Sequence, residues 1–549
     1  MIKSHVQWLV AIPFLSMSFL LGGCRAKPVV TRVPAVNPRE ILAQGDSVFV
    51  KSHLYGWRQA ETFYRRAYDL QPSAEIKDKL LLTRFLILTR EVDEDILDPD
   101  MERALGDICS GSLNARQKTL CDMAALYKAG TGMQPVQKKE PPDPALFDLE
   151  TSPLDAYLYS LCVQTYGLKE TNEAAAARAE KFKDSPLFVY LYLGKKTAQK
   201  AEQLEKAFPD FAELFDFMGG EQFQRTRYTA ARAYFKKAVD LIPDYTRSWN
   251  GLGNICLFAL EDNDKALEYY QTSLKWNPGN TAALFGMGVI FHNLGRYADS
   301  NDQLDKLLHG DLARGGRTSE EAVRYYQGEA NYYKAYNYHL LGNPEGARKF
   351  VEIAREFVPR SDNVNYLSGL LYYRSRQLRS AKDDFMRVLQ SGSTNCDAQY
   401  YLGRIYRESK EELDEKPPEQ TSGVKIPERL AEYLKQVPLP KEPKEKRSLD
   451  YLLAACSCMD ANVRNMEGKI KSVPSMDLDE TEKTLLQVRL KNHLQDYRRS
   501  SGSLIDGMLE LASGTEMETR DTYLSLMKEI RERMLQAVEP PALPSPGRR

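Results

Sequence analysis

The stretch that decides the fold is residues 249–278, WNGLGNICLFALEDNDKALEYYQTSLKWNP. Small and apolar residues recur in it at helical spacing in two runs, one around Gly253 and one around Ala266 and Tyr270. Pro278 closes the second run, because proline lacks the amide donor that a helix interior needs. A glycine inside a helix costs about 1 kcal/mol relative to alanine, so Gly253 indicates a close approach of a second helix. The stretch therefore predicts two antiparallel helices.

The same pattern returns along the middle of the chain with a period near 34 residues. Gly219 and Gly253 are 34 residues apart, Gly253 and Gly288 are 35 apart, and Gly369 and Gly403 are again 34 apart. A period of this length indicates helix pairs that stack into one elongated core, each pair contacting only its neighbours.

The repeated pattern, W-x2-L-G-x2-Y followed by A-x3-F and a closing proline, resembles the tetratricopeptide repeat. Trp249, Leu252 and Gly253 fill the first half of one unit, and Ala266 and Tyr270 fill its second half. The resemblance implies an all-α fold, a TPR-type α-solenoid of antiparallel helix pairs, with divergent helical regions on either side. It also implies that the first helix of each pair lines a concave surface for extended or helical peptides.

The beginning of the chain looks like a targeting segment. A short basic start is followed by an apolar run over residues 6–21, which as a helix spans about 24 Å, short of the ~30 Å core of a bilayer. The run ends in Leu21-Gly22-Gly23-Cys24, which resembles the lipobox of bacterial lipoproteins. That resemblance implies cleavage before Cys24 and lipid on its sulfur. The alternative is an ordinary secretory signal whose cleavage site contains a cysteine.

We expect seven segments along the chain. They are a signal peptide (1–23), a lipidated cysteine with a flexible tether (24–40), a divergent helical region (41–210), the repeat array (211–410), a charged Pro-rich linker (411–447), a C-terminal helical region (448–538) and a disordered tail (539–549). Arg25, which follows the lipidated cysteine, points within the lipoprotein resemblance to the outer membrane. The expected location is the cell envelope, on the outer membrane facing the periplasm.

Composition excludes some functions and permits others. The 549 residues carry 75 Lys plus Arg against 76 Asp plus Glu, so no overall positive charge exists to attract nucleic acid. Hydrophobic residues make up 42% of the chain, enough for a large core.

Seven cysteines remain beside Cys24. Cys109 and Cys121 could bridge adjacent helices, and we expect the others to be buried apolar thiols.

The sequence lacks the phosphate-binding, zinc-protease and serine-hydrolase motifs that place catalytic groups. We therefore expect no enzyme activity, no cofactor and no metal site. The acidic residues between 93 and 100 are expected to be a solvated loop, and the six histidines to lie on the surface or in the groove. The alternative function is a hydrolase or glycan-active enzyme in residues 448–535, with His493 and Asp496 close together on one helix.

Tyrosine is concentrated in the later repeats. Residues 325–406 contain 12 of the 31 tyrosines of the chain, and tyrosine offers a broad apolar face and a hydroxyl to a ligand. Part of this enrichment is repeat consensus and core. Register predicts a partner-binding groove lined by Asn250, Asn254, Phe258, Phe285, His292, Tyr332, Tyr336, His339, Tyr366, Tyr373, Tyr400, Arg404 and Arg407.

The repeats that bind chaperones hold a terminal carboxylate with Lys, Asn and Arg on successive first helices. Here Asn254 occupies the Asn place, but Asn250 replaces the Lys and Gly286 stands where a second Asn is needed. The sequence thus predicts a membrane-anchored, non-catalytic scaffold that binds a protein or peptide in the cell envelope by another chemistry. Assembly of a secretion, pilus or cell-wall machine is the expected setting, with no role for nucleic acid.

Overall fold

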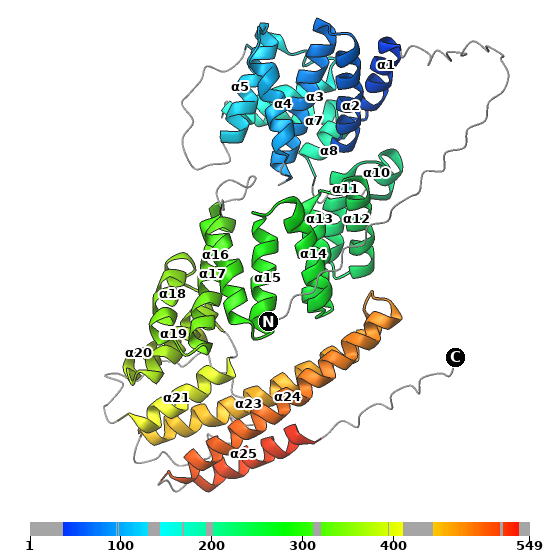
Figure 1. Ribbon diagram of the computed structural model, residues 1–549. Helices are drawn as coiled ribbons and strands as arrows, with labels where there is room; N and C mark the ends of the chain where they lie inside the picture. Colours follow the sequence, from blue (N-terminus) through cyan, green and yellow to red (C-terminus); the bar gives the residue numbers. More distant parts are fainter. Residues whose placement is uncertain are drawn as a thin grey trace, which may run out of the picture.

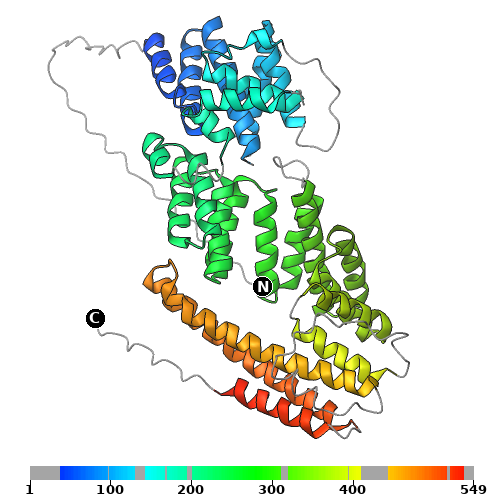
Figure 2. The same cartoon turned by 180° about the vertical axis from the view of Figure 1, so that it is seen from behind.

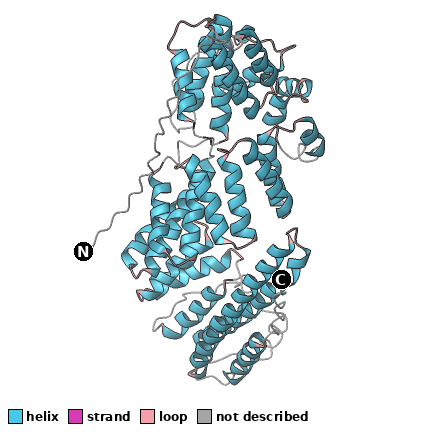
Figure 3. Cartoon of the chain, turned by 45° about the vertical axis from the view of Figure 1, so that its right-hand side comes forward, coloured by secondary structure: helices cyan, strands magenta, loops and turns pink. Residues whose placement is uncertain are grey.

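A computed structural model describes residues 37–94, 96, 98–129, 143–166, 170–193, 201–310, 320–392, 395–409, 443–515 and 520–536. The signal peptide, Cys24, most of the tether and of the Pro-rich segment, and the C-terminal tail lie outside these residues. Within them every regular element is a helix, and no strand occurs (Figure 3). The fold is an all-α, TPR-type solenoid, as the sequence predicts.

The N-terminal region forms one end of the molecule (Figure 1, blue to cyan). Its helices are α1 (Pro38–Phe49), α2 (Leu54–Leu70), α3 (Ala74–Asp93), α4 (Pro99–Cys109), α5 (Ala115–Ala129), η1 (Pro144–Leu146), α6 (Pro153–Tyr166), α7 (Asn172–Lys181) and α8 (Pro186–Leu191). The next helix, α10 (Ala201–Ala207), packs instead against the array, where Glu205 accepts from Tyr234 at 3.2 Å. α1 and α2 pair like a repeat, with the ring of Tyr64 seated on Gly45. α1 begins at Pro38 with Asn37 as its N-cap, so residues 38–40, expected in the flexible tether, are helical.

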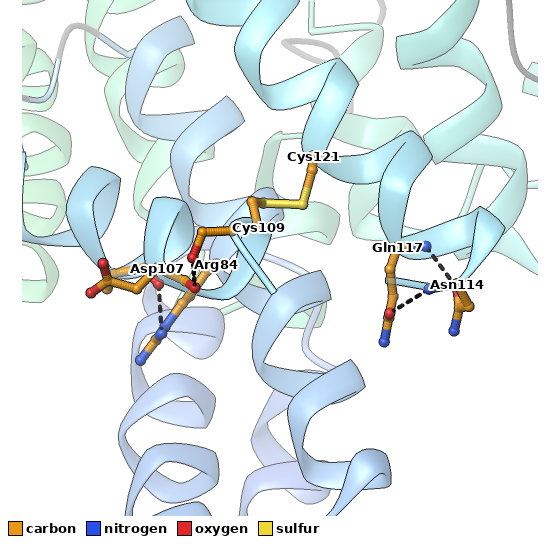
Figure 4. The surroundings of a disulfide bond; sticks show 8 residues. Arg84, Asp107, Cys109, Asn114, Gln117 and Cys121 are labelled. Carbon is orange, nitrogen blue, oxygen red and sulfur yellow. Dashed lines mark hydrogen bonds between the residues drawn. A yellow bond between two sulfur atoms is a disulfide. The ribbon is translucent and has the colours of Figure 1, made fainter. Parts of the chain in front are cut away.

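The expected bridge between Cys109 and Cys121 is present. The disulfide joins the end of α4 to α5, with Cα atoms 5.8 Å apart (Figure 4). Next to it Asn114 and Gln117 cap α5 reciprocally: the Asn114 side chain accepts from the Gln117 amide at 2.9 Å, and the Gln117 side chain accepts from the Asn114 amide at 2.8 Å.

Six helix pairs form the array. The first and second helices of the pairs are α11 (Ala212–Gln224) and α12 (Tyr228–Leu241), α13 (Thr246–Asn254) and α14 (Asn263–Trp276), α15 (Thr281–Asn293) and α16 (Tyr297–His309), α17 (Glu320–Leu340) and α18 (Pro344–Phe357), α19 (Asp362–Arg374) and α20 (Leu378–Gln390), and α21 (Cys396–Glu408) and α23 (Pro443–Ser472). The helices thus lie where the spacing of the small residues predicts them.

Several of the repeated glycines leave room for an aromatic ring, because a side chain at those positions would collide with it. A Cβ on Gly253 would lie 2.7 Å from the Tyr270 ring, and one on Gly286 would lie 2.6 Å from the same ring. Each ring of this kind therefore fills the space between the first helix of its own pair and the first helix of the next pair. This contact explains why Gly286 cannot be the asparagine of a carboxylate clamp.

A π-helical turn interrupts the second pair. Gly253 and Ala266 are 13 residues apart, whereas the corresponding residues of the first pair, Gly219 and Ala231, are 12 apart. The turn η2 (Ile255–Ala259) takes up the additional residue. It leaves Phe258 with 61% of its surface exposed.

The sixth pair is completed across the Pro-rich segment. The sequence predicts that the array ends with an unpaired half repeat at residue 410 and that a linker extends from there to residue 447. The structure instead packs Leu452 of α23 onto Gly403 of α21, and α23 begins at Pro443. Proline is tolerated at a first helical position, where the amide has no intrahelical partner.

The C-terminal helices turn back along the array (Figures 1 and 2, yellow-orange to red). α23 continues through η3 (Val473–Ser475) into α24 (Glu480–Ser513), and α25 (Arg520–Leu535) packs on both. The tip of the α23–α24 hairpin reaches the first two pairs, where Leu486 and Leu490 join their apolar core. Hydrogen bonds stabilise the same junction. In one of them the Thr229 hydroxyl donates to the Asp477 carbonyl at 2.9 Å.

A buried polar network ties the N-terminal region to the array. Arg90 is fully buried and donates to Glu213 at 2.7 Å. Glu94, placed by the sequence in a solvated loop, is only 4% exposed and accepts from Tyr245 at 2.5 Å and from Arg247 at 2.8 Å. The expectation for this residue was wrong, because a buried carboxylate is stable where charged and hydroxyl donors meet it.

Two further expectations need correction. His53, expected on the surface or in the groove, is buried and caps α2 by accepting from the Gly56 amide at 3.2 Å. Cys396 and Cys458, expected to be apolar thiols, form a second disulfide. The remaining described cysteines, Cys162, Cys256 and Cys456, are free and buried. Among the described helices, none is both long and apolar enough to cross a membrane.

Candidate functional site

Aromatic residues lie on four successive first helices, in ring contact between α15 and α17 and again between α19 and α21. Phe285 of α15 lies edge-on to Tyr333 of α17 with ring centres 5.9 Å apart, and His292 lies 5.1 Å from Tyr336. The surface continues along α17, where the rings of Tyr332 and Tyr336 are 6.1 Å apart. Adjacent repeats thus supply side chains that touch one another.

The surface extends through α19 to α21. Tyr366 packs on Phe385 with ring centres 5.8 Å apart, and Tyr401 stacks on the same phenylalanine at 5.3 Å. Tyr373 and Tyr401 are 5.0 Å apart. We call this the tyrosine surface: Phe285, His292, Tyr332, Tyr336, His339, Tyr366, Tyr373, Tyr400 and Arg404.

The repeat register explains the alignment. Phe285, Tyr332, Tyr366 and Tyr400 each stand three residues before the small residue that begins the close contact in their pair, which is Gly288, Ala335, Gly369 or Gly403. One turn of helix therefore places these four rings in one row along the array. Tyr332 and His339 are mostly buried within the surface, whereas Phe285, Tyr336, Tyr366 and Tyr400 are half-buried.

Hydrogen bonds fix several of these side chains. The Tyr373 hydroxyl donates to Glu408 at 2.7 Å, and Arg404 donates to the same carboxylate at 2.6 Å. The Arg404 guanidinium also lies 5.5 Å from the Tyr373 ring centre. His292 bonds Asn337 at 2.6 Å. Desolvation lowers the pKa of His292 and of His339, which favours neutral rings at pH 7.

Four residues expected in the groove lie elsewhere or are engaged within the chain. Asn250 is buried and donates to Asn280 at 2.9 Å, and Asn254 accepts from Tyr270 at 2.7 Å. Arg407 contacts Glu445 at 3.3 Å and the carbonyl of Gly514. Phe258 is exposed on the π-helical turn. We leave these four residues out of the tyrosine surface.

Sequence reasoning missed a cavity beside this surface. It has a volume of about 460 Å³ and lies where α21 meets the returning C-terminal helices. Its lining residues are Asn395, Cys396, Asp397, Met459, Asn462, Tyr497, Ser500, Ser501 and Leu504. The spacing of the repeats could not reveal it, because six of its nine lining residues come from α23 and α24.

The two residues named for the hydrolase alternative, His493 and Asp496, form separate ion pairs. His493 pairs with Glu261 of the array at 3.1 Å, and Asp496 pairs with Arg499 at 3.6 Å. Within the described part of the chain, no group of three or more His, Cys, Asp or Glu side chains is placed to hold a metal ion.

The fold and this surface define a helical-repeat protein. A model of the tetratricopeptide repeat matches residues 218–274 and 257–316, so the chain contains tetratricopeptide repeats. A repeat-containing protein of Methanocaldococcus jannaschii is 27% identical over 173 residues, which are 30% of this chain and 28% of that protein. Anaphase-promoting complex subunit 3 of Schizosaccharomyces pombe is 25% identical over 219 residues, 40% of this chain and 29% of the relative.

The chain thus spans less than a third of the length of these two relatives. Among solved structures, the anaphase-promoting complex assembly Cut9–Hcn1 is similar with a TM-score of 0.36 and 10% identity, covering 91% of this chain and 97% of that one.

Proposed function

We propose that this protein is a non-catalytic scaffold whose tyrosine surface binds a protein or peptide partner. The observation that carries the proposal is the row of aromatic side chains on the first helices of four successive repeats, with ring contacts between the third and fourth and between the fifth and sixth pairs. Tyrosine loses little conformational entropy on binding and combines apolar area with a hydroxyl. Half-buried rings held by neighbours are already ordered, so less entropy is lost when a partner covers them.

We further propose that the chain is exported and anchored in the cell envelope by lipid on Cys24, on the outer membrane facing the periplasm. The apolar segment that ends in Leu21-Gly22-Gly23-Cys24 supports this proposal. The two disulfides agree with it, since disulfides persist in oxidising compartments. Assembly of a secretion, pilus or cell-wall machine is the setting in which such a scaffold would act.

Crosslinking in living cells tests the binding surface. A photoreactive amino acid at position 336 should capture a defined partner, and the Tyr366→Ala/Tyr400→Ala variant should lose most of that capture. Tyr192→Ala, at an exposed position outside the array, is the matched control and should leave the capture unchanged. Circular dichroism must show that the double variant remains helical. Equal capture by the double variant and the wild type would contradict the proposal.

The anchor has its own test. Metabolic labelling with a fatty acid should label the wild type and not the Cys24→Ser variant, and that variant should leave the membrane fraction. Labelling that persists in Cys24→Ser would overturn the proposed anchor without bearing on the tyrosine surface.

A further inference from the structure

A second row of side chains runs beside the aromatic row on the same first helices. Glu329, Asn363 and Asp397 each stand six residues before the small residue of their pair, and three before Tyr332, Tyr366 and Tyr400. Residues three apart on a helix share one face. The tyrosine surface therefore carries a carboxylate in the fourth and in the sixth pair, separated by one pair with an asparagine.

Neither carboxylate forms an ion pair within the part of the chain that the structure describes. Among the described residues, no lysine, arginine or histidine forms an ion pair with Glu329 or with Asp397, whereas Glu408 on the same surface pairs with Arg404 and Arg376. Desolvation raises the pKa of Glu329 and of Asp397, and a hydrogen bond from Tyr366 opposes the shift at Asp397. A carboxylate among aromatic rings gains most from a cation that arrives with a ligand.

The cationic residues of the tyrosine surface do not form ion pairs with these two carboxylates. Arg404 is engaged by Glu408 at 2.6 Å. Burial lowers the pKa of His339 and Arg374 lowers it further, whereas burial raises the pKa of Tyr401 and Arg374 partly offsets that rise. Arg374 stands at the opposite end of its helix from Asn363. Histidines 292 and 339 have lowered pKa values. Glu329 and Asp397 are therefore the charged groups of the tyrosine surface that no ion pair within it balances.

The cavity of about 460 Å³ opens beside one of these carboxylates. Asp397 is part of its wall, together with the amide of Asn462 and the hydroxyls of Tyr497 and Ser500. Amide and hydroxyl oxygens accept hydrogen bonds from an ammonium or a guanidinium. This wall offers an elongated cationic side chain a carboxylate and neutral acceptors at once.

We propose that the partner of the tyrosine surface is an extended polypeptide segment with two basic side chains, one at Glu329 and one at Asp397 and its cavity. This inference rests on the proposed function and names the chemistry of its ligand. Neighbouring helices pack about 8–10 Å apart, so two repeats separate the carboxylates by roughly 20 Å. An extended chain advances about 3.3 Å per residue, which places the two basic residues about six positions apart. The rings between them add cation–π and apolar contact.

A random 12-residue peptide library displayed on phage, selected against the whole protein, is the test. The selected peptides should be enriched in Lys or Arg at two positions about six residues apart. A labelled peptide of that consensus should bind at least about tenfold more weakly to the Glu329→Gln/Asp397→Asn variant, and raised salt should weaken its binding to the wild type. The matched control, Asp302→Asn/Glu356→Gln on the second helices α16 and α18, should bind like the wild type.

The outcomes separate this inference from the proposed function. Selected peptides that are acidic or uncharged, or binding that is equal in the Glu329→Gln/Asp397→Asn variant, would overturn the basic ligand. If such peptides still lose affinity in Tyr366→Ala/Tyr400→Ala, the binding surface stands and its ligand chemistry does not. If no peptide is enriched, or if binding is indifferent to the tyrosines, both proposals fail.

Discussion

The Ser448 hydroxyl donates a hydrogen bond of 2.7 Å to the carbonyl oxygen of Gly403, across 45 residues of sequence. Ser300 donates in the same way to Gly288, also at 2.7 Å, within the third pair of the array. Both serines stand where the repeat pattern has alanine, and each is followed four residues later by leucine. α23 is therefore the second helix of a complete sixth repeat.

The chain ends that flank residues 410–442 lie next to each other. The Lys444 ammonium bonds the Ser409 carbonyl, and Glu445 accepts from Arg407 at 3.3 Å. Replacing these 33 residues by four Gly and Ser residues should therefore keep the sixth repeat intact. The shorter loop should raise stability by about 1–2 kcal/mol, since loop closure costs less entropy. Thermal unfolding followed by circular dichroism measures the change, and a loss of stability would contradict it.

Alanine at a glycine of the array should be destabilising where an aromatic ring fills the space. Gly253→Ala and Gly286→Ala each bring a Cβ within 2.7 Å of the Tyr270 ring, and we expect each to cost about 1–3 kcal/mol in urea unfolding. Gly220→Ala is the control, because a Cβ there meets nothing within 4 Å. It should be stabilising by about 0.5–1 kcal/mol, as expected for alanine in a helix. Equal effects at the three positions would refute the packing argument.

The two disulfides should contribute unequally. Cys396–Cys458 closes 62 residues and Cys109–Cys121 closes 12. Loop-closure entropy then predicts a loss of about 4 kcal/mol for Cys396→Ala/Cys458→Ala and about 3 kcal/mol for Cys109→Ala/Cys121→Ala. Denaturant midpoints of the two variants give the comparison, and a reductant should lower the midpoint of the wild type. A wild type indifferent to reductant would argue against both bridges.

His53 predicts a pH dependence of stability. Burial lowers its pKa to about 4, whereas the unfolded chain takes up this proton near pH 6.5. Protonation between these two values therefore favours unfolding, so stability present above pH 6.5 is lost as pH falls toward 4. The loss from this group is about 3 kcal/mol.

Denaturation at a series of pH values checks this expectation. His53→Asn retains an N-cap acceptor without a titrating ring. The slope of its unfolding free energy against pH, between pH 6.5 and 4, should correspond to about one proton fewer taken up on unfolding than in the wild type. His493→Asn, at a side chain that is 60% exposed, is the control. An unchanged slope in His53→Asn would show that the histidine is not buried in its neutral form.

The sequence predicts the array well and the contacts between distant segments poorly, for a physical reason. The glycines that make room for a ring have that ring in the same or the adjacent repeat, as Gly253 and Gly286 have Tyr270, so spacing alone exposes the pairing. Arg90 and Glu213 are 123 residues apart and share no period, and the cavity beside Asp397 needs α24 to return along the array. The row of tyrosines can be predicted from the repeat register. That Glu329 and Asp397 form no ion pair among the described residues could be learned only from the three-dimensional structure.

The return of the C-terminal hairpin to the first repeats gives the last prediction. Leu486 and Leu490 are buried in the core of the first two pairs, whereas the neighbouring Leu485 is 43% exposed. Leu486→Ala should therefore cost about 2–5 kcal/mol, and Leu485→Ala should stay within about 0.5 kcal/mol of the wild type. Because the tip of the hairpin contacts the first pairs while its base belongs to the sixth pair, hydrogen exchange in Leu486→Ala should rise around residues 473–490 while the fifth pair keeps its protection. Exchange that rises equally throughout the array would show that the hairpin and the repeats unfold as one unit.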